Sequence, residues 1–170
     1  MSGVPVSGGA VGGGAVGGGA VGGVPVSGVR RSSSATVWEQ VVGYSRAVAA
    51  GDYIFVSGCT SVDGAQFVHP GDAYAQTARA IENIRTGLEP LGAELSDVVR
   101  TRLYVTDISL WQEYGRAHAE AFGAARPATT MIQVSALVDA RMLVEIEAVA
   151  YRPGTRGLAG DAVGGAGAAP

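Results

Sequence analysis

Charged side chains alternate with apolar ones in two segments whose composition is typical of β-strands. Arg100 and Arg102 are separated by one residue, and so are Glu145 and Glu147. Side chains two positions apart in a strand lie on the same face of a sheet. Guanidinium and carboxylate groups are tolerated away from water only when they are paired. The chemistry that this spacing indicates is therefore ion pairing, or the binding of a polar small molecule, on one sheet face.

The same alternation predicts two contrasting faces for the whole sheet. The more uniformly aliphatic set, which we expect helices to cover, is Ile54, Val56, Val99, Leu103, Val105, Ile132, Val134, Val144, Ile146 and Ala148. The opposite set is Tyr53, Phe55, Ser57, Cys59, Arg100, Arg102, Tyr104, Thr129, Met131, Gln133, Glu145 and Glu147. Its aromatic residues and methionine would form an exposed apolar patch. We predict a subunit interface that encloses a polar pocket; the alternative is a solvated sheet face.

Cysteine and histidine are too few for metal or thiol chemistry. Cys59 is the single cysteine, which excludes an internal disulfide and a cysteine-based zinc site. A thiol nucleophile needs an activating base, and neither His69 nor His118 is placed to act on Cys59, so we expect a small buried residue. We expect His69 in solvent and His118 at the surface or in an interface. No metal and no organic cofactor are predicted.

The elements that must position these residues follow from hydrophobic periodicity. Strands are predicted over 36–42, 46–50, 53–59, 97–106, 129–134 and 142–151. Asp72 is a suitable N-cap for a helix to about Leu88, and Ser109 with Gln112 has capping-box spacing for a second helix that ends near Gly123. The order predicts an α+β fold, a mixed sheet with two helices on one face. Trp38 could form the wall of a pocket for a flat substrate, but in a first strand it is expected in the core.

Composition divides the 170 residues into one domain and two tails. Residues 1–35 hold 12 of the 27 glycines and 153–170 hold six, so we predict disordered Gly-rich tails around a domain at 36–152. That domain carries 9 Arg and 14 Asp or Glu, a net charge of −5, which argues against a nucleic-acid partner. Residues 1–29 lack the leucine-rich run of a spanning helix, and Arg30 and Arg31 follow the apolar stretch instead of preceding it, so we expect no membrane partner and a cytoplasmic location.

Several ordered motifs resemble the Rid family (YjgF/YER057c/UK114). They are Gly43–Val48 (GYSRAV), Tyr53–Gly58 (YIFVSG), Gln76-Thr77 with Glu82–Ile84, Val98–Asp107 (VVRTRLYVTD) and Val144–Ala150 (VEIEAVA). The resemblance covers 36–152. It implies a chorismate-mutase-like α+β subunit, a homotrimer with clefts between subunits, and cofactor-free hydrolysis of reactive enamines and imines.

The resemblance also implies roles for individual residues. Glu145 matches the glutamate that moves protons to the imine, and the matching cleft residues are Tyr44, Ser57 and Gly58, with Cys59 where glutamine is common. Glu145 could instead pair with Arg102. By parity, Tyr104 and Met131 join the substrate-binding set.

Thr129 departs from the family pattern. The segment Arg126–Thr130 reads RPATT, so Thr129 stands where the family's arginine binds a substrate carboxylate. Arg102 could substitute for it, although an ion pair with Glu145 or Glu147 is the favoured interpretation. Three functions stay open: an enzyme acting on an enamine, imine or β-dicarbonyl intermediate; a 2-iminobutanoate/2-aminoacrylate deaminase that uses Arg102; and a non-catalytic ligand-binding trimer.

Overall fold

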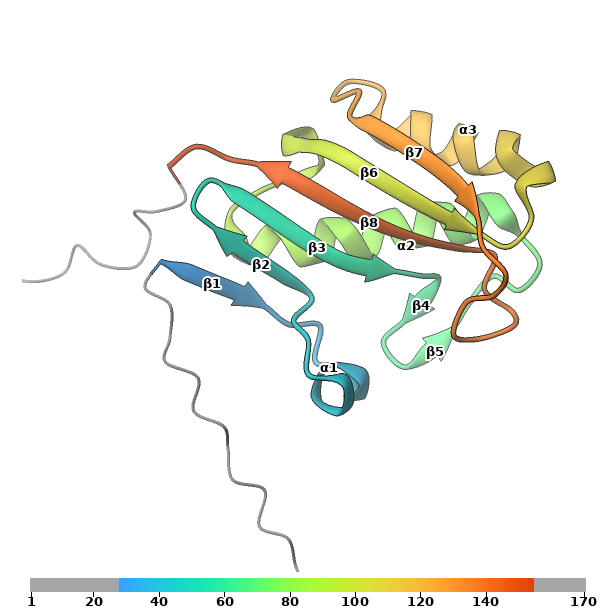
Figure 1. Cartoon of the computed structure of the whole chain (residues 1–170), viewed down its shortest axis with the longest axis horizontal. Helices are drawn as coiled ribbons and strands as arrows, with labels where there is room; N and C mark the ends of the chain where they lie inside the picture. Colours follow the sequence, from blue (N-terminus) through green and yellow to red (C-terminus); the bar gives the residue numbers. More distant parts are fainter. Residues whose placement is uncertain (1–27, 155–170) are drawn as a thin grey trace, which may run out of the picture.

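A six-stranded mixed sheet organises the described part of the chain. The computed structural model describes residues 28–154. The strand order is β1-β2-β3-β8-β6-β7, and every neighbouring pair is antiparallel except β6 and β7 (Figure 1). The strands are β1 (Val29–Ser32), β2 (Ala47–Ala50), β3 (Tyr53–Cys59), β6 (Val98–Val105), β7 (Ala128–Gln133) and β8 (Val144–Tyr151), with a separate hairpin of β4 (Val62–Asp63) and β5 (Gln66–Phe67). The predicted α+β class is confirmed.

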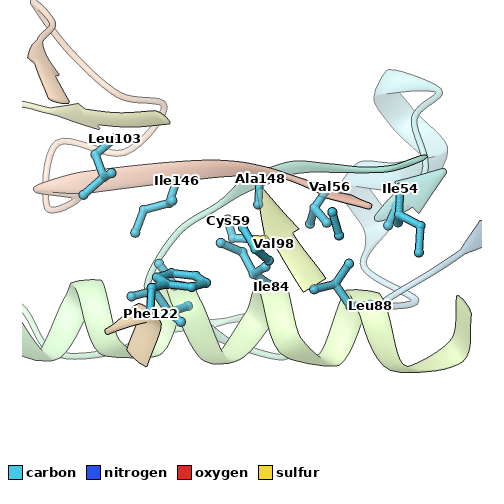
Figure 2. Close-up of a cluster of buried hydrophobic side chains, with 14 of the residues drawn as sticks. Ile54, Val56, Cys59, Ile84, Leu88, Val98, Leu103, Phe122, Ile146 and Ala148 are labelled. Atoms are coloured by element: carbon cyan, nitrogen blue, oxygen red, sulfur yellow. The ribbon is translucent and has the colours of Figure 1, made fainter. Parts of the chain in front are cut away.

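Two long helices, α2 (Ala73–Leu88) and α3 (Trp111–Phe122), cover one face of this sheet (Figure 1). The Asp72 side chain accepts a hydrogen bond from the Ala75 N–H at 2.9 Å and caps α2 as predicted. Figure 2 shows the core between the layers, where sheet residues meet Ile84 and Leu88 of α2 and Phe122 of α3. Truncation of a fully buried residue such as Ile84 to alanine would cost about 2–5 kcal/mol. The core fixes the sheet on which the site is built.

The N-terminal part of the domain differs from the prediction in two ways. Residues 36–42 do not form a strand; the structure has a short helix, α1 (Val37–Val42), which ends at Gly43 with φ +79°. The first strand is instead β1, which lies inside the segment 1–35 that was predicted to be a tail and pairs with β2, so the folded domain begins before residue 36. Valine-rich composition favoured a strand, but the buried Glu39 side chain accepts hydrogen bonds from Ser33 and Ser34 and fixes a helical turn. The tail predictions for 1–27 and 155–170 lie outside the described residues.

The second helix also begins differently. Asp107, not Ser109, provides the first cap: its carboxylate accepts from the Ser109 N–H at 2.9 Å at the start of a 3₁₀ turn (Ile108–Leu110) that leads into α3. No helix within residues 28–154 is long and apolar enough to cross a membrane.

Register irregularities change the predicted faces. The β3–β8 pairing shifts between Val56 and Cys59, so Cys59 lies in the core with only 2% exposed. The β6–β8 pairing shifts between Val98 and Arg100, so Val98 is buried and Val99 is 44% exposed. The predictions that Cys59 faces the open side and Val99 the helices are therefore wrong, because each shift reverses the alternation.

Strand β7 is placed on the opposite parity from the prediction. It runs parallel to β6, with Thr129 opposite the buried Thr101 and Met131 opposite the buried Leu103. Thr129 and Met131 therefore lie on the helix side of this edge strand, while Ile132 is 47% exposed on the open side. The three placements predicted for these residues are wrong.

Candidate functional site

A cavity of about 710 Å³ lies at the end of the sheet next to α1. Its wall combines α1, the β2–β3 region, the β4–β5 hairpin and one side of α2. Among the predicted site residues, five line it: Tyr44, Ser57, Gly58, Cys59 and Glu145. Segments that are about 100 residues apart in the sequence thus meet at one hollow, which makes it the candidate site.

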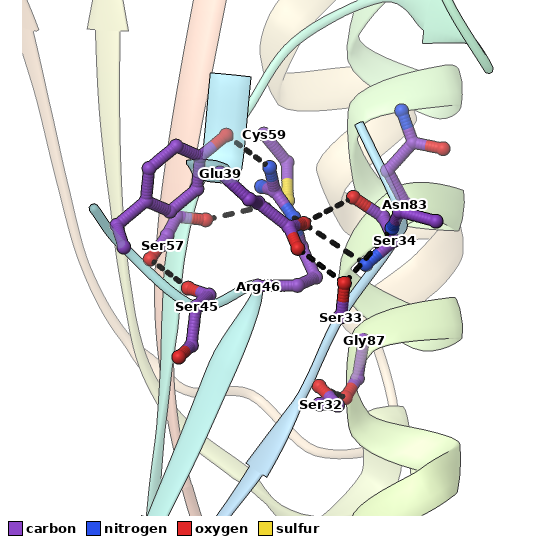
Figure 3. A network of polar contacts seen from close by, with 12 residues as sticks. Ser32, Ser33, Ser34, Glu39, Ser45, Arg46, Ser57, Cys59, Asn83 and Gly87 are labelled. Atoms are coloured by element: carbon purple, nitrogen blue, oxygen red, sulfur yellow. Dashed lines mark hydrogen bonds and ion pairs between the residues drawn. The ribbon is translucent and has the colours of Figure 1, made fainter. Parts of the chain in front are cut away.

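Arg46 organises the floor of the cavity. One of its terminal nitrogens donates to the Gly58 carbonyl at 2.8 Å and to Cys59 Sγ at 3.3 Å, and the other donates to the Tyr44 hydroxyl at 2.9 Å (Figure 3). Its Nε lies 3.8 Å from Glu39 Oε1, and both side chains are nearly buried. Burial alone would lower the pKa of Arg46, but Cys59, Tyr44 and Glu39 raise it overall, so the guanidinium stays charged.

Glu39 anchors α1 to this floor. Burial would raise the pKa of Glu39, but hydrogen bonds from Ser33 and Ser34, with Arg46 nearby, lower it overall (Figure 3). A six-residue helix is not stable in isolation. The buried carboxylate therefore holds α1 against the sheet and Arg46 in place.

The Glu145 carboxylate lies against the backbone of Gly58. A methyl group at Gly58 would come within 1.9 Å of Glu145 Oε1, so only glycine leaves room for the carboxylate there. Burial raises the pKa of Glu145, the positive charge of Arg46 opposes this, and the nearby Glu147 adds to it, for a net increase. A half-buried carboxyl group with a raised pKa is suited to exchange a proton with a molecule in the cavity.

Tyr44 and Ser57 have hydroxyl groups oriented by the protein. The Tyr44 oxygen accepts from Arg46, which leaves its own proton free for donation. The Ser57 hydroxyl donates to the Ser45 carbonyl at 2.8 Å, which leaves its oxygen able to accept. Cys59 is different: burial raises the pKa of its thiol, and nearby Arg46 only partly offsets this. Its buried position agrees with a packing role.

Arg102 and Tyr104 do not line the cavity. Arg102 forms an ion pair with Glu147, its neighbour across the β6–β8 pairing, which confirms the favoured ion-pair interpretation for Arg102. Tyr104 lies opposite Glu145 in the same pairing. Both belong to the open sheet face beside the site.

Thr129 and Met131 do not line the cavity that Glu145 lines. The Thr129 hydroxyl bonds to Thr101 Oγ1 at 2.9 Å and to the Pro127 carbonyl at 3.1 Å. Thr101 also bonds to His118 Nε2 at 2.9 Å, and burial lowers the pKa of His118. This polar chain explains both a threonine at this position and the part-buried His118.

Three residues of the site were missed or misplaced from the sequence: Trp38, Glu39 and Arg46. Arg46 belongs to the motif Gly43–Val48, but nothing in its spacing distinguished it from a surface arginine. Trp38, predicted in the core, is 59% exposed and lines the cavity. No group of three or more His, Cys, Asp or Glu residues suited to a metal occurs within 28–154.

These features define a class of protein: an α+β domain that has two helices on one sheet face and, at the end of the sheet, a cavity with a polar floor. Comparisons identify the family. The family model described as "Endoribonuclease L-PSP" matches residues 36–152. A solved structure of Rv2704 from Mycobacterium tuberculosis, described as a member of the YjgF/YER057c/UK114 family, is 48% identical with a TM-score of 0.67 and covers 72% of this chain and 98% of that one. The chain belongs to this family, as the resemblance implied.

Two curated relatives extend the comparison. The uncharacterized protein SCO2049 of Streptomyces coelicolor is 39% identical over 73% of this chain and 92% of its own length. The 3-aminoacrylate deaminase RutC of Acinetobacter baylyi is 35% identical over 64% of this chain and 86% of its own length. At the family level, the family model and the match to RutC support a deaminase-like role on enamines or imines.

Proposed function

We propose that the chain is an enzyme that acts on a reactive enamine, imine or β-dicarbonyl intermediate in the cavity beside Gly58. The observation that carries this proposal is the Glu145 carboxyl group, which has a raised pKa and opens onto the cavity. Support also comes from the relative named as a 3-aminoacrylate deaminase.

Each cavity residue has a role in this proposal. For an imine, protonated Glu145 donates its proton to the nitrogen, water adds to the carbon, and the Glu145 carboxylate accepts a proton from that water, which gives a carbinolamine. Glu145 then returns this proton to the amino nitrogen and accepts the hydroxyl proton as the C–N bond breaks, so that ammonia leaves and a carbonyl product forms. Tyr44 donates a hydrogen bond, and Ser57 accepts one, so the substrate is oriented in the half-enclosed hollow. For an enamine, the first proton goes to carbon instead.

The assembly that we propose is a homotrimer built on the open sheet face. Tyr53, Phe55 and Tyr151 are 41–50% exposed and their rings cluster there, with centroids 5.1 Å apart for Tyr53 and Tyr151. This exposed aromatic patch beside the Arg102–Glu147 pair favours burial against another copy of the chain. The Gly58 cavity would then lie near the subunit boundary.

A deaminase that clamps an imino acid with Arg102 receives less support than the main proposal. The guanidinium is engaged by Glu147, and Arg102 does not line the cavity. A purely ligand-binding trimer would use the same hollow, and substitution of Glu145 separates it from the enzyme.

The test is imine hydrolysis with and without the protein. Amino-acid and amine oxidases generate imines with and without a carboxylate, threonine dehydratase supplies 2-iminobutanoate, and semicarbazide traps what is not hydrolysed. We expect acceleration by the wild type and a loss of about 10²–10⁴-fold in Glu145→Gln, as is typical for a general acid–base group. If Glu145→Gln and the wild type give equal rates with every imine, the proposed role of Glu145 is refuted. Unchanged binding without turnover in either protein indicates the ligand-binding trimer.

A further inference from the structure

Helix α1 reverses the usual distribution of polar and apolar residues. Its glutamate, Glu39, is 8% exposed, whereas the adjacent Trp38 is 59% exposed. Glutamate is rarely buried and large aromatic residues are normally at least mostly covered. Because Glu39 anchors the helix to Arg46, the reversal places Trp38 where it lines the cavity.

The apolar side of the cavity extends beyond Trp38. Val42 lies one helical turn further on the same face of α1, and Val138 faces the cavity from the segment before β8; both are largely exposed. The polar side is the floor of Tyr44, Ser57 and Glu145. The cavity therefore has an apolar wall and a polar end.

The charges of the cavity favour a cation over an anion. Four charged residues line it. Arg79 pairs with Asp63 at 2.7 Å, and Arg46 is shared among Glu39, Tyr44 and the Gly58 carbonyl. Glu145 makes no direct ion pair with any residue in the described range. A substrate carboxylate would thus meet an acidic group and no uncommitted cation.

We propose that this cavity selects imines or enamines that carry a flat apolar group and no carboxylate, with Trp38 contacting the flat group and Glu145 pairing with the protonated nitrogen. The inference rests on the proposed function, since it uses the same cavity and the same carboxylate. Proton transfer from Glu145 to the imine nitrogen leaves an iminium cation beside the Glu145 carboxylate. A substrate that has no carboxylate of its own forms this ion pair without a second anion that competes for the cation. The aromatic ring of Trp38 then determines which substituent is preferred.

Stable amidines test the proposal, because an amidinium has the planar cationic C–N group of a protonated imine. The probes are benzamidine, acetamidine, which lacks the ring, and benzoate, which replaces the cation by an anion. Binding is measured by titration calorimetry at pH 8. The proteins are the wild type, Trp38→Ala, Trp38→Phe, Glu145→Gln and Trp111→Phe; the last changes the chain's other tryptophan, which lies outside the cavity lining.

We expect the wild type and Trp111→Phe to bind benzamidine at least about tenfold more tightly than either other probe. Trp38→Ala should lose about tenfold for benzamidine and little for acetamidine, and Trp38→Phe should restore most of the loss. Glu145→Gln should remove the preference for benzamidine over benzoate. Benzoate binding at least as tightly as benzamidine would overturn the inference, as would unchanged benzamidine binding in Trp38→Ala.

The mass of each variant in solution tests whether Trp38 contacts another copy of the chain instead of a substrate. If Trp38→Ala alters the oligomeric state and leaves the ring preference unchanged, Trp38 contacts another copy of the chain, and the inference is wrong. The imine assay stays independent of these results. Selective amidine binding without turnover refutes the proposed function alone, and turnover of imino acids without amidine selectivity refutes the substrate class alone.

Discussion

The contact between Gly58 and Glu145 gives the most direct prediction about the site. In Gly58→Ala the new methyl group would lie 1.9 Å from Oε1, 2.7 Å from Cδ and 3.0 Å from Cγ of Glu145. Ordinary contact begins near 3.4 Å, so the carboxylate must move by about 1.5 Å. Gly58 does not adopt a positive φ, so the backbone itself accepts alanine. The substitution therefore moves a functional group and leaves the sheet intact.

The magnitude follows from the displacement. A catalytic group misplaced by about 1 Å can cost about 10²-fold in rate, so we expect kcat/KM to fall by about 10²-fold or more. Stability should change little, because Glu145 is on the cavity surface and can rotate away. Imine hydrolysis is measured beside thermal unfolding to separate the two effects.

Gly115→Ala is the matched control. Gly115 lies in α3, and apart from its chain neighbours and the helix's own backbone no atom lies within 4 Å of the position that an added methyl group would take. Alanine there should stabilise the fold by about 0.5–1 kcal/mol without a loss of rate. If Gly58→Ala keeps wild-type activity and an unchanged melting temperature, the position of the Glu145 carboxylate does not control the reaction.

Four further predictions follow from the same contacts. Because burial raises the pKa of Glu145 above its ordinary value near 4.5, its ionisation disfavours the folded state as pH rises through the raised value; Glu145→Gln should therefore raise Tm near pH 7, and the difference should vanish in scans near pH 4. Arg102→Ala removes a part-exposed ion pair and should change the melting temperature little, with kcat/KM within about threefold; a rise of about 10²-fold in KM for imino acids would favour the Arg102 clamp instead. Phe55→Asp places a charge in the exposed aromatic patch and should lower the mass measured by light scattering from that of the proposed trimer to that of a monomer, which an unchanged mass would contradict. Cys59 should react with a thiol reagent far more slowly in folded protein than in denaturant, since burial both covers the thiol and raises its pKa; equal rates would show that the floor opens readily.

The fold was largely predictable because its strong signals are local and periodic. Asp72 with the apolar positions of 73–88 fixed α2, and alternation fixed β3 and β8. The shifts in pairing at Val56–Cys59 and Val98–Arg100 were not predictable, because Val98 and Val99 are both apolar and Ser57–Cys59 are small residues, so neither segment shows where the alternation changes phase. The shift in β3 reversed the side of Cys59, and the shift in β6 reversed the sides of Val98 and Val99.

The site was predictable only where the family motifs reached. Tyr44, Ser57, Gly58 and Glu145 were found through the resemblance, and the structure brings them to one cavity. Thr129 was misplaced because β7 runs parallel to β6 at the sheet edge, and register across a parallel edge cannot be read from one strand alone.

Arg46 does not replace the missing family arginine, although its positive charge acts on the Glu145 carboxylate. A carboxylate clamp needs two parallel N–H donors directed at the ligand. The terminal nitrogens of Arg46 are directed at the Gly58 carbonyl, Cys59 Sγ and the Tyr44 hydroxyl, and release of these groups would leave them unpaired in a nearly buried position. Its charge instead limits the rise in the pKa of Glu145, and its hydrogen bonds orient Tyr44. The donors of Arg46 are thus already engaged within the polar floor, whereas a carboxylate clamp would require free donors. This arrangement favours the proposed substrates, which carry no carboxylate.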